Sequence, residues 1–359
     1  MSNQTPKLSP ILEALTAKLA EGPPQRREDA FYKPRPQPYW FHDGKSWIQA
    51  STSSLSNASP PSPFDTSAIR LMSWNIDILV GFVEERMAFA LDHLQGLVSQ
   101  TPSFTPILIY LQEMGQSDLA QIREAAWIQS NFLIMEYDER NWLTPLYGTT
   151  MLVDRRLKIE SVFRVPWVSK FERDGLFVDI GLERDGGEKG EVLRLCNAHL
   201  ESLVADPPVR PLQLEAAGKY LRENEVQAAL LAGDLNAIQP FDHTLHLENG
   251  LKDIYLELGG KEDSDEGCTW GYQVPHYLRN KFGCSRMDKI LFRGAINAKR
   301  FERVGMGVKV AEDKRQKMRD AGEEEWVTDH YGVMGDFELE GWKLVGNEAD
   351  GNKVMVKLS

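Results

Sequence analysis

The sequence predicts an α/β fold in which short apolar strands alternate with amphipathic helices. Three observations support this class: compact apolar runs that end at polar residues, helix-period patterns between those runs, and a chain of 359 residues that is 42% hydrophobic. Such a chain can bury a large core, as one big domain or as two smaller ones. Apolar runs of this length are typical of strands that are covered on both faces.

The elements are expected in a regular order along the chain. Apolar residues recur at helical spacing between successive strand-like runs, and an Asp-Gly-Gly turn precedes one of the strands. The predicted strands are 69–75, 107–111, 150–153, 176–182, 192–198, 228–232, 289–292 and 332–337, and the predicted helices are 87–98, 119–126 and 211–222.

Composition also divides the chain into four parts. Residues 1–49 form an N-terminal extension, in which leucines and an isoleucine at helical spacing predict a short amphipathic helix over 8–20. A Ser/Pro-rich linker follows at 50–66. The main domain is expected at 67–342, and 343–359 form a C-terminal extension with a possible hairpin.

Charge and cysteine content narrow the function classes. A net charge of −12 leaves no broad basic field for non-specific binding along a duplex. The three cysteines are odd in number and lack CxxC spacing, so we expect no disulfide partner and a reducing compartment. No apolar run reaches the ~20 residues of a membrane span, and no signal-peptide pattern is present. We therefore expect an intracellular protein of the nucleus or cytoplasm, without a membrane partner.

Eight polar residues at or near the ends of apolar runs are the candidate catalytic residues. They include carboxylates, amides and imidazoles, but no Ser, Cys or Lys nucleophile, a mixture that suits a hard metal ion and an attacking water. The eight are Asn75, Glu113, His199, Asp234, Asn236, Asp288, Asp329 and His330.

Hydrolysis of a phosphate ester gives these residue types complementary roles. The anionic ester needs charge neutralisation, an oriented water and help for the departing oxygen. Mg²⁺, with Mn²⁺ as an alternative, prefers oxygen ligands, and we expect Glu113 to be the main one. Asn75 and Asp329 are the further metal candidates.

The remaining five residues are expected to handle the water and the phosphoryl group. If the strand conformation persists, Asp234 and Asn236 point to the same face and can hold and polarise a water. His330 can donate to a phosphoryl oxygen if Asp288 keeps it protonated. His199 is a candidate second phosphate contact.

Taken together and in this order, the motifs resemble the endonuclease/exonuclease/phosphatase, or DNase I-like, superfamily. Singly, a Gly-Asp-x-Asn or an Asp-His is more often structural; the order and the shared placement at strand ends reverse that balance. The resemblance runs from about residue 71 to 337. It implies a four-layered α/β sandwich with two central mixed β-sheets, a catalytic domain at 67–342, and Mg²⁺-dependent phosphoester hydrolysis.

Within the superfamily, the flanking residues resemble the tyrosyl-DNA phosphodiesterase 2 (TDP2) branch. Trp74-Asn75-Ile76-Asp77, His199-Leu200-Glu201-Ser202 and Thr269-Trp270 match segments of that branch. The resemblance implies cleavage of the phosphodiester between a tyrosine and a DNA 5′ end, and it makes Asp77, Ser202 and Trp270 candidate substrate-binding residues.

One departure keeps a second class of substrate open. The branch has Leu-Arg-Asp after the Asp-x-Asn motif, whereas this chain has Ala237-Ile238-Gln239 and so lacks a substrate-contacting cation. The alternative substrate is a small phosphorylated nucleotide, sugar or other metabolite. A catalytically silent binding protein would be expected to have lost Glu113, Asp234 or His330, and it has lost none. No motif identifies a protein partner.

Overall fold

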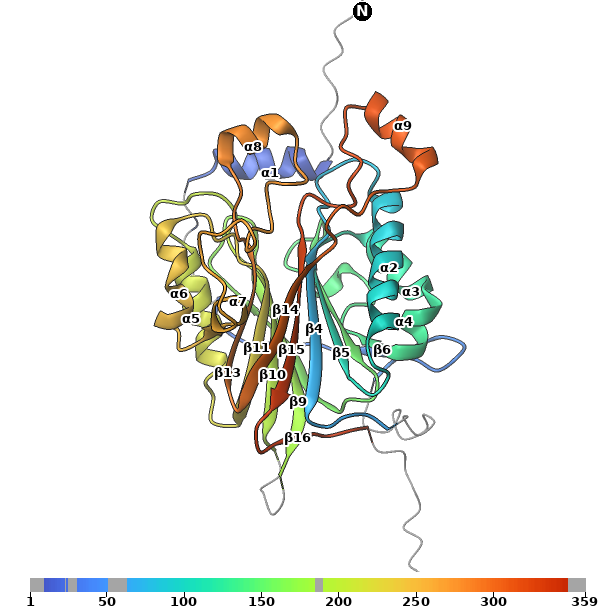
Figure 1. Ribbon diagram of the computed structural model, residues 1–359, viewed down its shortest axis with the longest axis vertical. Helices are drawn as coiled ribbons and strands as arrows, with labels where there is room; N and C mark the ends of the chain where they lie inside the picture. The colour runs from blue at the N-terminus through green and yellow to red at the C-terminus, as the bar shows by residue number, and fades with distance from the viewer. Residues whose placement is uncertain (1–9, 23, 25–30, 51–62, 185–189, 348–359) are drawn as a thin grey trace, which may run out of the picture.

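Two eight-stranded mixed sheets pack face to face, with helices on both outer faces, in the computed structural model of the protein (Figure 1). The structure describes residues 10–22, 24, 31–50, 63–184 and 190–347. The predicted four-layered α/β sandwich is confirmed.

The first sheet contains one parallel pair, β10–β11, among antiparallel neighbours. Its order is β1-β8-β9-β10-β11-β13-β12, and β16 pairs with β9 beside this path. The strands are β1 (Arg35–Pro36), β8 (Ile159–Pro166), β9 (Asp174–Glu183), β10 (Val192–His199), β11 (Val226–Asp234), β12 (Lys252–Asp253), β13 (Asp288–Gly294) and β16 (Lys343–Leu344).

The second sheet also contains one parallel pair, β4–β5. Its order is β14-β15-β4-β5-β7-β6-β2-β3. The strands are β2 (Trp40–His42), β3 (Trp47–Gln49), β4 (Ala68–Asn75), β5 (Ile107–Met114), β6 (Phe132–Ile134), β7 (Gly148–Asp154), β14 (Ile296–Val304) and β15 (Gly332–Leu339).

Helices cover the outer face of each sheet. α2 (Val83–Gln100), α3 (Gln116–Glu124) and α4 (Ala126–Asn131) lie on the second sheet, and α5 (Arg210–Tyr220) and α6 (Leu245–Glu248) lie on the first (Figure 1). None of the helices in the described ranges is long and apolar enough to cross a membrane. The other helices are α1 (Pro10–Ala20), α7 (Ile254–Glu257), α8 (His276–Phe282) and α9 (Glu312–Asp320), with 3₁₀ turns at Glu139–Asn141 and Pro240–His243.

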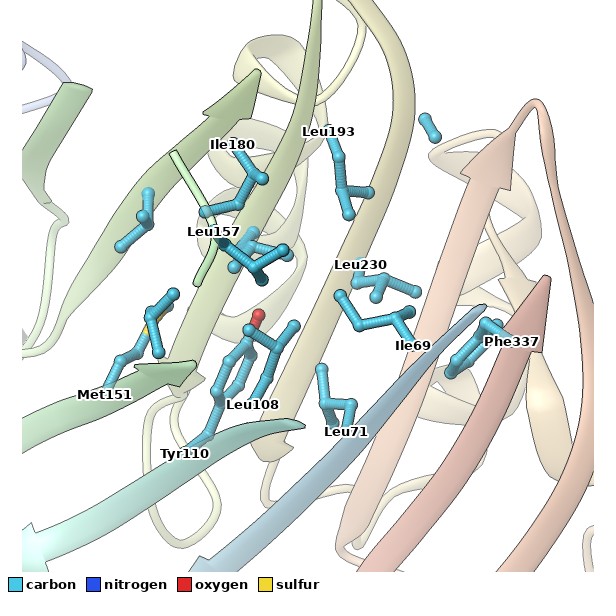
Figure 2. Packing of buried hydrophobic residues seen from close by; sticks show 14 of the residues in the cluster. Ile69, Leu71, Leu108, Tyr110, Met151, Leu157, Ile180, Leu193, Leu230 and Phe337 are labelled. Carbon is cyan, nitrogen blue, oxygen red and sulfur yellow. The ribbon is translucent and has the colours of Figure 1, made fainter. Parts of the chain in front are cut away.

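The main core lies between the two sheets. Leu71 and Leu108 of the second sheet belong to one buried cluster with Leu193 and Leu230 of the first, as Figure 2 shows. Because side chains alternate along a strand, the residues between them face the helices instead, for example Ile109 beside α2 and α3. Both faces are therefore buried, which explains why these strands form continuous apolar runs.

The sheets extend beyond the predicted limits of the main domain. Strand β1 pairs with β8, β2 pairs with β6, and β16 pairs with β9, so residues on both sides of 67–342 complete the sheets. Strands β8 and β14 were also absent from the predicted set, because charged residues interrupt their apolar patterns. The Asp-Gly-Gly turn, most of the linker and the second half of the possible hairpin lie outside the described residues.

Gly233 provides a test of the close β10–β11 pairing. Its φ is +148°, and a Cβ at this position would lie 1.7 Å from the carbonyl oxygen of Ala198. We expect Gly233→Ala to lower the free energy of unfolding by about 2–4 kcal/mol, measured by urea denaturation. Gly250→Ala is the control: φ is +66° and the space is open, so only the left-handed strain of about 1–2 kcal/mol is expected. Equal losses in the two variants would contradict this account.

Candidate active site

The candidate residues meet because six strand termini lie at one edge of the sandwich. Parallel pairing places the carboxyl ends of β4 and β5 together, and likewise those of β10 and β11. Strands β13 and β15 run antiparallel to β11 and β4, so their starting residues reach the same edge. Within the first sheet, Asp234 pairs directly with His199 on one side and with Asp288 on the other.

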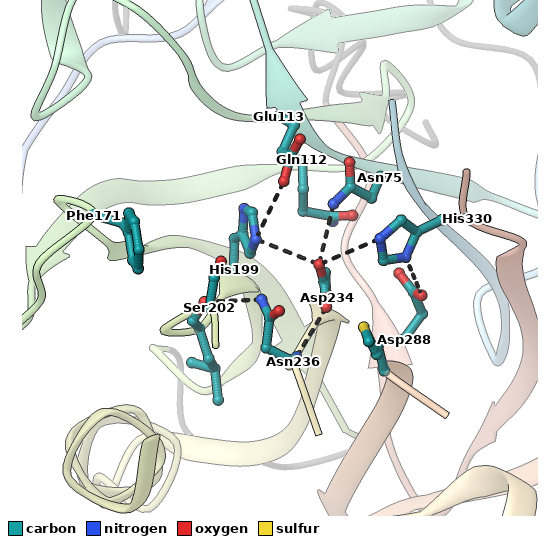
Figure 3. A network of polar contacts seen from close by, with 12 residues as sticks. Asn75, Gln112, Glu113, Phe171, His199, Ser202, Asp234, Asn236, Asp288 and His330 are labelled. Carbon is teal, nitrogen blue, oxygen red and sulfur yellow. Dashed lines mark hydrogen bonds and ion pairs between the residues drawn. The ribbon is translucent and has the colours of Figure 1, made fainter. Parts of the chain in front are cut away.

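Asp234 is the centre of the polar network in Figure 3. Its Oδ2 accepts a hydrogen bond of 3.1 Å from Asn75 Nδ2 and lies 3.4 Å from His199 Nε2 and 3.8 Å from His330 Nε2. Its Oδ1 accepts from the backbone N–H of Asn236 at 2.9 Å. Burial opposes ionisation, but His330 and His199 outweigh it and lower the pKa of Asp234 below its usual range. Asp234 is therefore ionised and can accept hydrogen bonds.

His330 and Asp288 form a buried ion pair. His330 Nδ1 lies 2.8 Å from Asp288 Oδ2. Burial disfavours the imidazolium, but Asp288, Asp329 and Asp234 outweigh it and raise the pKa of His330 well above its usual value. At neutral pH His330 therefore carries a positive charge, and its Nε2–H points toward the site.

His199 has the opposite protonation state. Its Nδ1 lies 2.8 Å from Nη1 of Arg173. The other terminal nitrogen of this guanidinium, Nη2, donates to Ser202 Oγ at 2.8 Å. Burial and the positive charge of Arg173 lower the pKa of His199, although Asp234 and Glu113 oppose this. His199 Nε2 lies 3.7 Å from Glu113 Oε1. The site thus contains one neutral and one charged histidine.

Asp77, Glu113 and Asp329 concentrate negative charge beside this network. Burial raises the pKa of Asp77, and Asp329 and Glu113 raise it further, to well above its usual value. Glu113 has a φ of +54° at an irregularity between β5 and β7, which turns its partly exposed side chain toward His199. Asp329 Oδ2 accepts a 2.7 Å hydrogen bond from the Trp270 indole.

These carboxylates fit a divalent cation better than the histidine groups do. Ligand atoms of Glu113, His199 and Asp234 lie within 4.8 Å of one another, as do those of Asp234, Asp288 and His330. However, the pairing of His199 Nδ1 with Arg173 leaves its proton on Nε2, and His330 is protonated, so neither nitrogen is a free ligand. Of Asp77, Glu113 and Asp329, Glu113 is the one that belongs to such a group, and carboxylate oxygens are the ligands that Mg²⁺ prefers.

The structure corrects the predicted geometry of Asn236. Strand β11 ends at Asp234, and Asn236 has a left-handed φ of +47° because its backbone N–H turns back to the Asp234 carboxylate. The two side chains therefore do not follow strand alternation. Asn236 Nδ2 instead donates to the carbonyl oxygen of Leu200 at 3.1 Å and ties the β11 loop to the loop after β10.

The substrate-binding candidates lie in three different surroundings. Asp77 lies within the acidic cluster, Ser202 contacts Arg173, and Trp270 is paired with Asp329. Arg173 itself was missed by the sequence reasoning, because Phe171-Glu172-Arg173 precedes strand β9 and reads as an ordinary charged turn. No sequence signal marks it as part of the site.

A family model supports the interpretation of this geometry as a hydrolytic site. The model described as Endonuclease/Exonuclease/phosphatase family matches residues 72–330, which include all eight candidate residues. The chain belongs to this family. As a family member it is a metal-dependent phosphoester hydrolase. No curated protein matches the chain.

Solved structures of the family share the fold. TDP2 from D. rerio, complexed with single strand DNA product, is 18% identical with a TM-score of 0.56, covering 76% of this chain and 99% of that chain. Truncated TDP2 from Caenorhabditis elegans is 21% identical with a TM-score of 0.54, covering 76% and 97%. A family protein from Bacteroides thetaiotaomicron is 13% identical with a TM-score of 0.54, covering 77% and 100%. At these identities the likeness is one of fold.

Metal binding to this family member should displace a proton from Asp77. Its raised pKa favours the protonated form, whereas a cation favours the carboxylate, so affinity for Mg²⁺ should increase as the pH rises through the pKa of Asp77. Calorimetric titration in two buffers of different ionisation enthalpy measures the protons released. Asp77→Asn should abolish this release, while the exposed control Asp313→Asn should retain it. Unchanged release in Asp77→Asn would refute the assignment.

The ion pair of Asp288 with His330 should be visible in a histidine titration. In Asp288→Asn the pKa of His330, measured by NMR, should fall by about 1–3 units. Because this pKa is higher in the folded protein than in the unfolded chain, the contribution of the pair to stability is complete below the unfolded pKa and is lost as pH rises through the folded pKa. His330→Ala assigns the resonance, and an unshifted midpoint in Asp288→Asn would contradict the pairing.

Proposed function

We propose that this protein is a Mg²⁺-dependent phosphodiesterase that removes tyrosine-blocked 5′ ends from DNA, with Mn²⁺ as an alternative cofactor. The observation that carries the proposal is that an ionised Asp234 lies between the N–H group of a neutral imidazole, His199, and that of a positively charged one, His330. This arrangement suits water attack on a phosphoester. We expect this activity in the nucleus or the cytoplasm.

The residues around Asp234 divide the chemistry. Asp234, oriented by Asn75 and Asn236, accepts the hydrogen of the attacking water. His330 and His199 donate to phosphoryl oxygens on which negative charge develops. A bound Mg²⁺ would be held by Glu113 with Asn75, Asp77 and Asp329, and would neutralise charge on the phosphate and the departing oxygen.

An aromatic and cationic rim beside Trp270 supports a nucleic-acid substrate. The rings of Tyr272 and Tyr331 stack at 5.6 Å, Arg279 lies 4.8 Å from the first ring, and Arg303 lies 5.5 Å from the second. Tyr331 follows His330 directly, so the rim begins at the site. Stacked rings with nearby cations are typical of surfaces that bind unpaired bases. The similar TDP2 of D. rerio was solved with single-strand DNA.

A small phosphorylated metabolite is the second candidate substrate. The segment Ala237-Ile238-Gln239 provides no cation, and the Gln239 amide oxygen instead accepts a 2.9 Å hydrogen bond from Arg210. Arg210 is itself paired with Asp242 at 2.7 Å, which fixes this segment to the start of α5. The segment therefore contributes no positive charge toward a long DNA substrate.

An assay on a substrate panel separates the two candidates. With Mg²⁺, we expect tyrosine release from a 5′-tyrosyl oligonucleotide to exceed turnover of abasic duplex, unblocked single-stranded DNA and small phosphate esters. Asp234→Asn and His330→Ala should each lower kcat by roughly 10² or more.

Glu113→Gln supplies the background for the same assay. Release from the tyrosyl substrate no faster than this background would sink the DNA-end hypothesis, and preferential turnover of a small ester would favour the metabolite instead. Full activity in Asp234→Asn or His330→Ala would refute the role of that residue.

A further inference from the structure

Arg173 is a buried guanidinium that contacts two groups of the site at once. Its side chain lies beneath the surface, with one Nη 2.8 Å from His199 Nδ1 and the other 2.8 Å from Ser202 Oγ. Its Nε has no hydrogen-bond partner among the described residues. No carboxylate pairs with it in the described part of the chain, so its charge is directed at the site.

The chemistry of a guanidinium determines the role of each partner. Arginine only donates hydrogen bonds and stays protonated, whereas an imidazole nitrogen and a hydroxyl oxygen can each donate or accept. Since Arg173 donates to His199 Nδ1, that nitrogen carries no proton, and the ring hydrogen must be on Nε2. Since Arg173 donates to Ser202 Oγ, the hydroxyl hydrogen is left free to point elsewhere.

A second set of contacts holds Arg173 in place. The buried Glu201 carboxylate accepts from the backbone N–H of Lys170 at 2.9 Å and from the Ser169 hydroxyl at 2.5 Å, which fixes the turn before Arg173. Tyr147 donates to the carbonyl oxygen of Phe171 at 2.8 Å. The rings of these two residues lie 5.4 and 5.7 Å from the guanidinium carbon. Glu201 therefore stabilises the turn before Arg173.

Arg173 and His199 line a cleft beside the site. Its lining also includes Trp142, Tyr147 and Glu172. His199 Nε2 has no hydrogen-bond partner of normal length among the described residues; Asp234 Oδ2 lies 3.4 Å from it. An unpaired buried N–H is unfavourable, and an anionic oxygen from a ligand would supply the missing acceptor.

We propose that Arg173 is a positioning residue that fixes His199 and Ser202 as hydrogen-bond donors to one anionic phosphoryl group. Neither residue has a defined donor role without it, because each can also accept. The proposal rests on the proposed function for the identity of the ligand, but the tautomer of His199 is a property of the free protein. Arg173 acts through its two partners and does not itself need to contact substrate.

The tautomer is measured by NMR of the protein labelled with ¹⁵N-histidine. In the wild-type protein the signal of His199, assigned with His199→Ala, should show a proton on Nε2 and none on Nδ1. Arg173→Met should produce a mixture of tautomers or an imidazolium, with the signals of the five histidines outside the site unchanged, which shows that the fold is retained. Arg184→Met is the control: Arg184 is exposed and directly follows strand β9, whereas Arg173 directly precedes it, so this variant should leave His199 unchanged.

Kinetics with the tyrosyl substrate separate positioning from direct binding. Arg173→Met should lower kcat by roughly 10² in the wild-type background, but by less than about threefold in His199→Ala/Ser202→Ala, because its effect passes through those residues. Arg173→Lys, which offers a point charge instead of a fork, should retain only part of the activity. An equal loss in both backgrounds would show direct substrate contact and overturn the proposal.

The NMR result is independent of the substrate. A single Nε2–H tautomer that persists in Arg173→Met overturns the proposal even if the tyrosyl substrate is cleaved. Conversely, failure of every substrate in the panel would reject the proposed function, while the wild-type and variant spectra would still decide the role of Arg173.

Discussion

Buried hydrogen bonds between the two sheets are the constraint on which the geometry of the site depends. Asn75 on β4 donates to Asp234 on β11, and Gln112 on β5 donates to Asn197 on β10 at 2.8 Å. Apolar packing between sheets is not directional and tolerates sliding, whereas a buried polar group that loses its partner costs about 1–3 kcal/mol. Asn197 Nδ2 also donates to the carbonyl oxygens of Leu111 and Thr150 in the second sheet, and together these bonds fix the register of one sheet against the other at the edge that carries the site.

Because of this register, the two buried histidines have different protonation states. His330 lies among three carboxylates, which keep it charged, whereas His199 is held between Asp234 and the guanidinium of Arg173. The same carboxylate, Asp234, faces both rings. A single acceptor thus lies between two donors, and the difference between the donors comes from their outer neighbours rather than from their own residue type.

The sequence could predict the residues of the site but not all of their contacts. Residues such as Glu113 and Asp234 follow apolar runs, and parallel pairing alone brings such strand ends together, so their convergence was predictable. The conformation of Asn236 was not, because an Asx turn within Gly-Asp-x-Asn competes with strand continuation.

Long-range contacts account for the other differences. Arg173 reaches the site only because Glu201, about thirty residues away, holds its turn, and no local pattern encodes that contact. The short strands β1, β2 and β16 likewise form through pairing with β8, β6 and β9, not through their own periodicity.

The charge balance of the site explains why hydrolysis in this family needs a cation. In and beside this network the structure gathers five carboxyls and three positive groups, Arg86, Arg173 and His330, so the site is negative even when one carboxyl is protonated. The carboxylates are Asp77, Glu113, Asp234, Asp288 and Asp329. An anionic phosphoester entering such a site would be repelled. The excess of negative charge therefore favours the binding of a divalent cation. The bound cation would in turn attract the phosphate.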